Sequence, residues 1–395
     1  MSDVAVETPA PGDTAAGRVT ILAGCSFAGL EFLYRLSRRR RLAPGTMVVV
    51  EPRARHPYIP LAHETVIGRR APGTLQFDTP AFCRSIGADF ISDSLASLRT
   101  AERMVTLTSG RVLAYDRLIL AVGSVPDIPA AFAQSPSVVA AKFLDDPAAL
   151  HRRLHVLRVQ GARVLRAVVV GGGITAVEWS AESASARVDG VRIVTTLVGG
   201  DPRLLPRFHP RVGRRAAHVL STLRIETLLG RRALDISGDH VVLEQNVSIP
   251  FDMILWAAGV RANPVLAALG LPLTEDGHVV VTPRLAVPGL DGVYAMGDCA
   301  RIAGAGAARP TTDRAIDAIW QGAYLARRVA AGWRPDAGPA FRLRRTFPYG
   351  MSLGPRRSAI VYRGLHADMR PFVWFRRWLQ WGYYARFRIE AWRRG

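Results

Sequence analysis

The sequence predicts an α/β protein made of two parallel-sheet domains and a helical C-terminal tail. Two glycine-rich loops, which begin at Gly24 and Gly171, carry most of this prediction. A strand-like run that ends in an acid at Glu51 and a late Gly297-Asp298 motif support it. Each loop follows an apolar run and opens a helix-like pattern, so each marks the first strand and helix of an open parallel sheet.

The first loop contains Gly24, Ser26, Ala28 and Gly29 after the apolar run 19–23. A strand that ends in such a loop points backbone N–H groups and a helix N-terminus at a pyrophosphate. We therefore expect these four residues to bind a dinucleotide cofactor. Ser26 stands at the middle glycine position of the usual motif.

Glu51 follows the apolar run 47–50, which predicts the second strand of the same sheet. An acid roughly 20 residues beyond the first loop can accept hydrogen bonds from the ribose hydroxyls of a dinucleotide. The alternative, a solvated acid at a strand end, stays open from the sequence alone.

The second loop contains Gly171 and Gly173 after the apolar run 167–170, and it is followed by Glu178. One loop implies one dinucleotide. Two loops in one chain therefore predict a flavin and a nicotinamide, each bound in its own Rossmann-like domain.

Three later segments complete the pattern, and each carries residues that we assign to cofactor binding. They are residues 292–300 with Gly297 and Asp298, residues 115–123 with Gly123, and residues 252–259 with Gly259. In this order, the motifs resemble the two-dinucleotide-fold flavoproteins. The resemblance implies FAD as the flavin and Asp298 as a contact on its ribityl-phosphate side. It also implies that the other two segments return the chain between domains.

Within this group the chain looks most like the type II (non-proton-pumping) NADH:quinone oxidoreductases. The segments that carry the resemblance are residues 202–206, 256–264 and 348–354, together with an aromatic and basic C-terminus. Sulfide:quinone oxidoreductases and apoptosis-inducing-factor-like quinone reductases are near relatives. No cysteine follows Cys299, which counts against the persulfide-carrying cysteine pair that sulfide oxidation needs.

The resemblance implies that electrons pass from NAD(P)H through FAD to a quinone. Glu178 matches a glutamate that lies near the nicotinamide and the flavin in the family, where it orients the nicotinamide or relays protons. A salt bridge is the structural alternative for Glu178, and more so for Glu182. Two other functions stay open: a soluble NAD(P)H-dependent flavin reductase with a non-quinone acceptor, and a regulatory FAD-binding protein with little turnover.

Two positions depart from the family pattern. Gly199 stands where NADH-using relatives have an acid that holds the adenosine ribose. The choice between NADH and NADPH therefore stays open, since Arg203 and Arg207 are near in sequence and Asp201 is a shifted acid. Ile316 replaces the glutamine that contacts quinone, so the sequence leaves the identity of the acceptor open.

The motifs divide the chain into four regions. We expect a disordered tail at 1–17, an FAD-binding domain at 18–140 and 284–340, an NAD(P)H-binding domain at 141–283, and a membrane-associating region at 341–395. Strand-like runs at 191–198, 240–244 and 278–282 fit a parallel sheet with a small antiparallel piece.

The formal net charge of +20 predicts attraction to anionic surfaces. Lys142 is the only lysine, so arginine supplies almost all of the positive charge. A GC-rich genome is an alternative explanation for this excess of arginine, one that needs no functional pressure. We expect an anionic membrane surface as partner and no nucleic acid. The three cysteines form no CxxC pair and the histidines show no metal-ligand spacing, so no metal is expected.

From Pro371 onward the pattern predicts an amphipathic helix. One face collects apolar side chains at spacings of three and four: Trp374, Trp378, Trp381, Ala385, Ile389 and Trp392. Arginines, among them Arg376, lie on the other side. This combination suits a membrane interface, and packing against the protein's own core is the alternative. We expect a cytoplasmic protein, peripheral on the inner face of the cell membrane; a homodimer stays possible.

The segment 350–354 fits the GxSxG pattern of serine hydrolases, with Ser352 as the serine. That pattern needs a helix after the serine, and then an acid and a histidine. The following residues predict a turn and a strand instead, so we expect no hydrolase.

Overall fold

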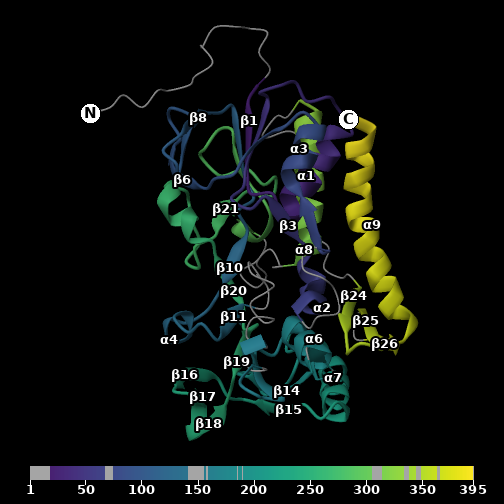
Figure 1. Cartoon of the computed structure of the whole chain (residues 1–395). Coiled ribbons are helices and arrows are strands. Elements are labelled where there is room, and N and C mark those ends of the chain that lie inside the picture. Colours follow the sequence, from purple (N-terminus) through teal and green to yellow (C-terminus); the bar gives the residue numbers. More distant parts are fainter. Residues whose placement is uncertain are drawn as a thin grey trace.

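The computed structural model describes residues 18–66, 74–140, 155–156, 159–184, 186–188, 190–304, 314–332, 338–343, 348–362 and 365–394. Two parallel sheets lie one above the other, and a long C-terminal helix runs along one side (Figure 1). The predicted α/β class with two Rossmann-like sheets is confirmed. The predicted tail at 1–17 lies outside the described residues.

The first sheet has five parallel strands in the order β22-β9-β1-β2-β5. They are β1 (Thr20–Ala23), β2 (Met47–Val50), β5 (Asp89–Ile91), β9 (Arg117–Leu120) and β22 (Val293–Ala295). In the sequence, β22 follows all the strands of the second sheet, so the chain returns to complete the first sheet. Every residue of β1 and β9 is buried, as expected for strands covered on both faces.

Two helices cross closely on the first sheet. They are α1 (Phe27–Ser37), which follows β1, and α8 (Ala315–Ala330). A Cβ on Gly322 would lie 2.3 Å from the carbonyl oxygen of Ala28, so the two backbones touch at this point. Only glycine permits that approach.

Smaller elements surround this sheet. The strands are β3 (Arg55–Pro57), β4 (Gln76–Asp78), β6 (Leu95–Arg99), β7 (Met104–Leu107), β8 (Val112–Ala114), β21 (Val279–Val281) and β23 (Ala300–Ile302). The short helices are η1 (Ile59–Leu61), α2 (Ala62–Val66), α3 (Thr79–Ser85), η3 (Pro264–Leu269) and η4 (Gly297–Cys299). The run expected at 278–282 is therefore β21, which pairs with β23.

The second sheet has the order β11-β19-β12-β14-β13, with β15 also paired to β14. Its strands are β11 (Val138–Ala140), β12 (Val164–Val170), β13 (Arg187–Val188), β14 (Val191–Gly199), β15 (Glu226–Leu229) and β19 (Met253–Trp256). The helices are α4 (Ala130–Ala133), α6 (Ile174–Ser183) and α7 (Pro210–Thr222). The small antiparallel piece consists of β16 (Ala233–Ser237), β17 (His240–Leu243) and β18 (Val247–Pro250), with η2 (Glu244–Asn246) between the last two.

The two chain crossings between the sheets lie side by side. β10 (Ser124–Pro126) pairs antiparallel with β20 (Val260–Ala262). The Asn263 side-chain amide donates to the carbonyl of Val122 at 3.1 Å, which ties the end of the second crossing to the start of the first.

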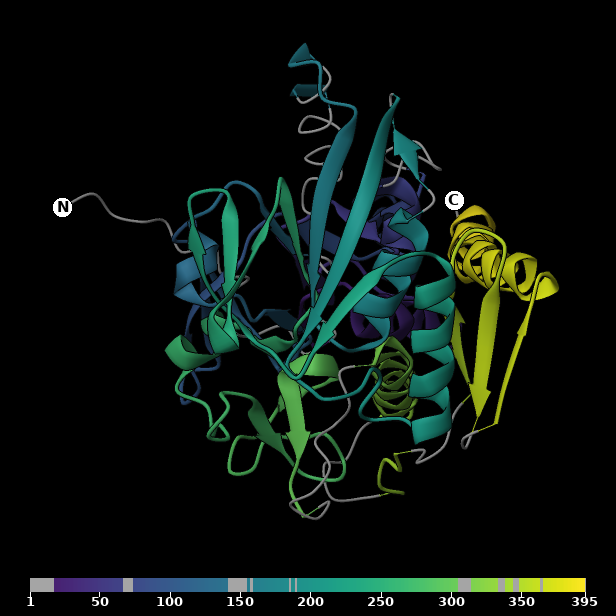
Figure 2. The same cartoon turned by 90° about the horizontal axis from the view of Figure 1, so that it is seen from below.

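The C-terminal region has a three-stranded antiparallel sheet and then a helix. The strands are β24 (Tyr349–Ser352), β25 (Ser358–Tyr362) and β26 (Leu365–Met369), and the helix is α9 (Pro371–Arg394). The sheet lies beside α7, as the view from below shows (Figure 2). Met351 and Val361 join the hydrophobic core of the second sheet.

α9 packs on the first domain through a face that the sequence pattern did not single out. Val373, Tyr383, Tyr384 and Phe387 are buried, and the last three belong to the core of the first sheet. The predicted tryptophan face is exposed: Trp374, Trp378, Trp381 and Trp392 are 61–82% accessible. The helix therefore has two apolar faces, one inside and one outside. None of the helices in the described part of the chain has the length and hydropathy of a transmembrane span.

Candidate functional site

Gly24 opens the first loop, directly after β1 and beside the end of β9. Its φ is +96°, and a Cβ there would lie 2.3 Å from the carbonyl oxygen of Ala121, just after β9. Ser26 is the N-cap of α1, and Ala28 and Gly29 lie in the first turn. A Cβ on Gly29 would in turn meet the carbonyl oxygen of Gly24 at 2.3 Å. The loop is thus compact enough for backbone N–H groups to approach a phosphate.

Glu51 follows β2 and points back into the first loop. Its Oε2 accepts a hydrogen bond from the backbone N–H of Cys25 at 2.8 Å. Its Oε1 accepts from the backbone and the guanidinium of Arg53, at 3.1 and 3.2 Å. The side chain is only 7% exposed and borders a small pocket formed with Ser26, Arg55, His56 and neighbouring residues. A carboxylate beside the loop suits ribose hydroxyls.

Asp298 lies in η4, next to the N-terminus of α1. Its Oδ2 accepts a hydrogen bond from the Ser124 hydroxyl at 2.9 Å. Gly297 has a φ of +75° and donates its N–H to Gln321 Oε1 of α8 at 2.6 Å. A Cβ on Gly297 would come within 3.4 Å of the Ala28 Cβ, so the late motif and the first loop are in contact.

Gly123 and Gly259 follow β9 and β19, where the chain leaves each sheet. Their φ angles are +70° and +133°, and a Cβ would meet nothing within 4 Å at either position. Glycine is therefore required there by backbone conformation, and open space adjoins both residues.

The second loop repeats the geometry of the first. Gly171 N–H donates to the carbonyl of Val198 at 2.8 Å, as Gly24 N–H does to Val50. A Cβ on Gly171 would lie 2.5 Å from the carbonyl oxygen of Ala257. Gly173 is the N-cap of α6 and has open space beside it.

The correspondence between the two loops shows which residue of the first domain Gly199 replaces. Since Val198 is equivalent to Val50, Gly199 occupies the place that Glu51 holds in the first domain. The second loop therefore lacks the carboxylate that the first one has. Arg203, expected near this place, is held elsewhere: its guanidinium donates to the carbonyls of Leu205, Pro206 and Phe208 at 3.3, 2.5 and 3.1 Å.

Glu178 lies on α6 and faces the C-terminal region. Its Oε1 accepts a hydrogen bond from the backbone N–H of Ser352 at 2.8 Å and lies 3.4 Å from Arg376 Nη1. Burial raises the pKa of Glu178 to about 7, although Arg376 and the Ser352 N–H act against the rise. Its carboxyl group can therefore hold or release a proton near neutral pH.

Two more buried glutamates meet the same arginine. Arg376 Nη2 lies 3.5 Å from Glu64 of α2 and 3.5 Å from Glu182 of α6. We call Arg376 and the three glutamates the buried glutamate cluster. Sequence reasoning placed Arg376 on the polar face of the tail helix but did not find its partners, which come from elements distant in sequence.

Ser352 donates hydrogen bonds to the buried glutamate cluster and is not part of a hydrolase site. Its hydroxyl donates to Glu182, and the side chain is fully buried at the end of β24. No helix follows it before β25. The expectation against a hydrolase agrees with this arrangement.

Ile316 lies in the first turn of α8, next to a group of polar side chains formed by Arg314, Asp317 and Tyr349. Arg314 donates to Asp317 Oδ2 at 2.6 Å and to the hydroxyl of Tyr349. Ile316 itself is partly exposed. The helix end is thus fastened to β24, and the apolar residue at this position makes any acceptor site here less polar than a glutamine would.

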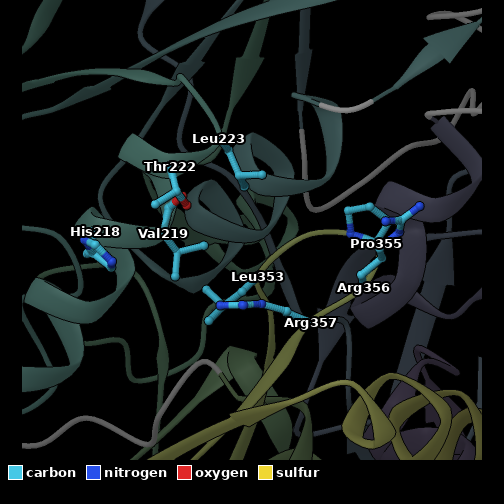
Figure 3. Close-up of a pocket in the computed structure, with 8 residues that line it drawn as sticks. All are labelled: His218, Val219, Thr222, Leu223, Leu353, Pro355, Arg356 and Arg357. Carbon is cyan, nitrogen blue, oxygen red and sulfur yellow. The ribbon is translucent and has the colours of Figure 1, made fainter.

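A pocket of about 730 Å³ lies between α7 and the turn after β24 (Figure 3). His218, Leu353 and Arg357 are among its lining residues. None of the predicted site residues lines it. Among the described residues, no group of three His, Cys, Asp or Glu side chains could hold a metal ion.

The chain belongs to the pyridine nucleotide-disulphide oxidoreductase family, whose pattern it matches over residues 18–322. The demethylphylloquinone reductase NdbB of Synechocystis sp. is 26% identical over 317 residues, which are 78% of this chain and 76% of that protein. The type II NADH:quinone oxidoreductase of Haemophilus influenzae is 23% identical over 328 residues, 71% and 73% of the two chains. The predicted resemblance is confirmed.

A solved structure shares the fold over almost the whole chain. NDH2 from Plasmodium falciparum, in complex with NADH, gives a TM-score of 0.78 at 15% identity and covers 95% of this chain and 97% of its own. The family implies a pyridine nucleotide and a flavin as ligands. The residues present fit both, because each sheet ends in a glycine loop that a Cβ would fill.

Proposed function

We propose that this protein is an FAD-dependent oxidoreductase that passes electrons from NAD(P)H to a quinone at a membrane surface. One observation carries the proposal: two loops of the same geometry, at Gly24 and Gly171, end the first strands of two parallel sheets. Such loops are dinucleotide sites. The relatives named as quinone oxidoreductases supply the acceptor class.

The first loop would hold FAD through Gly24, Ser26, Ala28 and Gly29, with Glu51 at a ribose and Gly297 and Asp298 toward the flavin. The second would hold the nicotinamide nucleotide through Gly171 and Gly173. Gly123 and Gly259 leave open space at the two crossings. A bound flavin accepts a hydride from a nicotinamide and passes two electrons to an acceptor.

Glu178 is the residue that we propose for proton handling. Its pKa of about 7 suits proton exchange at neutral pH, and Ser352 and Arg376 fix its position. Its carboxyl group can equally orient a nicotinamide through a hydrogen bond.

The exposed tryptophan face of α9 supports membrane contact by residues 371–395. Exposed indoles beside arginine suit the headgroup boundary of a bilayer. At the end of α9, Arg394 donates to the carbonyl of Ser37, so the four exposed arginines 38–41 lie close by. Basic side chains near an anionic surface add about 1 kcal/mol each. We propose a peripheral location on the cytoplasmic face of the cell membrane.

Anaerobic stopped-flow absorbance tests the function. The flavin-loaded protein is mixed with NADH or NADPH, and then with a menaquinone analogue. Bleaching of the flavin followed by recovery with the quinone supports the proposal. Bleaching without recovery favours the non-quinone acceptor, and no bleaching with either nucleotide favours the regulatory function. A protein that cannot be loaded with FAD contradicts all three.

A further inference from the structure

Arg232 lies against the end of β14, where the second domain lacks its acid. A Cβ placed on Gly200 would lie 3.0 Å from Arg232 Cγ and 3.5 Å from its Nε. The arginine side chain therefore runs past the residue next to Gly199. In a Rossmann-like domain, this strand end faces the adenosine ribose of the nucleotide.

The turn after β15 puts Arg232 in this place. β15 pairs parallel with β14, with Leu229 opposite Gly199. Arg231 N–H then donates to the carbonyl of Gly199 at 3.1 Å, and Gly230 N–H donates to the carbonyl of Asp201 at 2.9 Å. Three backbone contacts thus fix the path of the chain up to Arg232.

The guanidinium of Arg232 is available, whereas its neighbours are engaged. Arg232 is exposed, and its guanidinium forms no ion pair with any residue that the structure describes. Arg231 donates to the Gln245 side chain at 3.1 Å, and Arg203 is held by backbone carbonyls. The carboxylate of Glu244 accepts a hydrogen bond from the backbone N–H of Arg232 at 3.0 Å. This acid therefore contacts the backbone of Arg232.

We propose that Arg232 binds the 2′-phosphate of NADPH and that the protein therefore discriminates in favour of NADPH over NADH. The inference rests on the proposed function and adds the nucleotide specificity. An acid at this strand end selects the free 2′-hydroxyl, whereas a nearby arginine accommodates a 2′-phosphate. A guanidinium suits phosphate because its N–H groups donate in pairs. Asp201, also exposed nearby, and the Glu244 carboxylate at the Arg232 backbone are the acids that oppose this preference.

Binding of 2′,5′-ADP and of 5′-ADP tests this directly. Isothermal titration calorimetry on the flavin-loaded protein compares wild type with Arg232→Ala, and Arg231→Ala is the matched control. We expect Arg232→Ala to weaken 2′,5′-ADP binding about tenfold or more and to leave 5′-ADP binding within about twofold. Arg231→Ala should change neither. Arg232→Lys should restore part of the loss, since it keeps the charge but loses the paired donors.

The catalytic counterpart is the ratio of kcat/KM for NADPH to that for NADH, which should fall in Arg232→Ala through a higher KM for NADPH. An unchanged ratio together with unchanged 2′,5′-ADP binding overturns the inference, and so does an equal loss for both ADP forms. If neither nucleotide reduces the wild-type flavin, the proposed function fails, while the binding comparison still decides the role of Arg232.

Discussion

Arg386 of α9 forms an ion pair with Glu31 of α1, with 2.7 Å between Nη2 and Oε2. Glu31 is completely buried and also accepts a hydrogen bond from Arg35 at 2.7 Å. The guanidinium of Arg386 lies 4.6 Å from the ring centres of Tyr383 and Phe387. The C-terminal helix is therefore an integral part of the first domain. Deleting it would expose aromatic core residues, so membrane binding must be tested by substitution.

Arg386→Ala should lower the free energy of unfolding by about 2–4 kcal/mol, because it leaves the buried carboxylate of Glu31 with one partner and removes the contact with two rings. Urea unfolding followed by circular dichroism measures the change. Arg388→Ala is the control: Arg388 is exposed on the same helix, and its loss should cost less than about 0.5 kcal/mol. Equal effects of the two variants would show that the ion pair contributes nothing.

Replacing Trp374, Trp378 and Trp381 together with alanine should strongly reduce binding to phosphatidylglycerol vesicles and leave the unfolding temperature nearly unchanged. These rings are exposed, so their loss removes little packing, whereas each indole buried in a lipid interface contributes about 1 kcal/mol or more. Vesicle co-sedimentation measures binding.

The control for this experiment is Leu234→Ala, which removes an exposed apolar side chain from the second domain. High salt should detach the wild type only in part, because the apolar contribution is not screened. If the triple variant sediments as the wild type does, the tryptophan face does not contact lipid.

Glu178→Gln should remove a destabilising contribution that appears as the pH rises. The pKa of Glu178 is about 7 in the folded protein, above its ordinary value of 4.5. Folding therefore takes up a proton between these values, and the unfolding free energy falls as pH rises from about 4.5 to 7. Relative to wild type, the glutamine variant should gain about 2–3 kcal/mol between pH 5 and pH 8.

Urea unfolding at the two pH values provides the measurement, and Glu275→Gln is the control for loss of an exposed charge. Glutamine can still accept the Ser352 N–H, so the fold should persist. A constant difference between variant and wild type across this pH range would mean that Glu178 is not protonated there.

Gly24→Ala should abolish flavin binding or destabilise the first domain severely. The added Cβ would lie 2.3 Å from the carbonyl oxygen of Ala121, and the φ of +96° is unfavourable for any other residue. Gly45→Ala separates the effect of the steric clash from that of the positive φ, because Gly45 has a φ of +72° but open space around it. That variant should cost only about 1–2 kcal/mol and keep the flavin. Flavin content after purification distinguishes them.

The features that could be predicted from the sequence are those formed by continuous segments of the chain. Each glycine loop stands between a segment with the pattern of a strand and a segment with the pattern of a helix. The position of Gly199 at the end of a predicted strand showed that glycine replaces the expected acid there. The buried glutamate cluster was not predictable in this way. Glu64 lies on α2 and Glu178 on α6, and no local pattern indicates that Arg376 of α9 meets both.

The tail helix shows a second kind of limit. Its tryptophans follow helical spacing, but so do Tyr383, Tyr384 and Phe387. Periodicity identifies two apolar faces and does not decide which one turns inward. In the structure the hydroxyl of Tyr384 donates to the carbonyls of His56 and Leu75, at 3.0 and 3.2 Å. These partners lie more than 300 residues earlier in the sequence.

Gly199→Glu should shift nucleotide preference toward NADH. The new carboxylate would stand where Glu51 stands in the first domain, so it can accept a hydrogen bond from a free 2′-hydroxyl and would repel a 2′-phosphate. Gly199 has no positive φ, and its added Cβ would come within 3.0 Å of the flexible end of Leu229 only, so the chain can accommodate the change. The ratio of kcat/KM for NADH to that for NADPH should rise about tenfold or more. Gly199→Gln has the same size without the charge and should shift the ratio less. Equal losses for both nucleotides in the two variants would mean that the side chain blocks the site and that this position does not select the nucleotide.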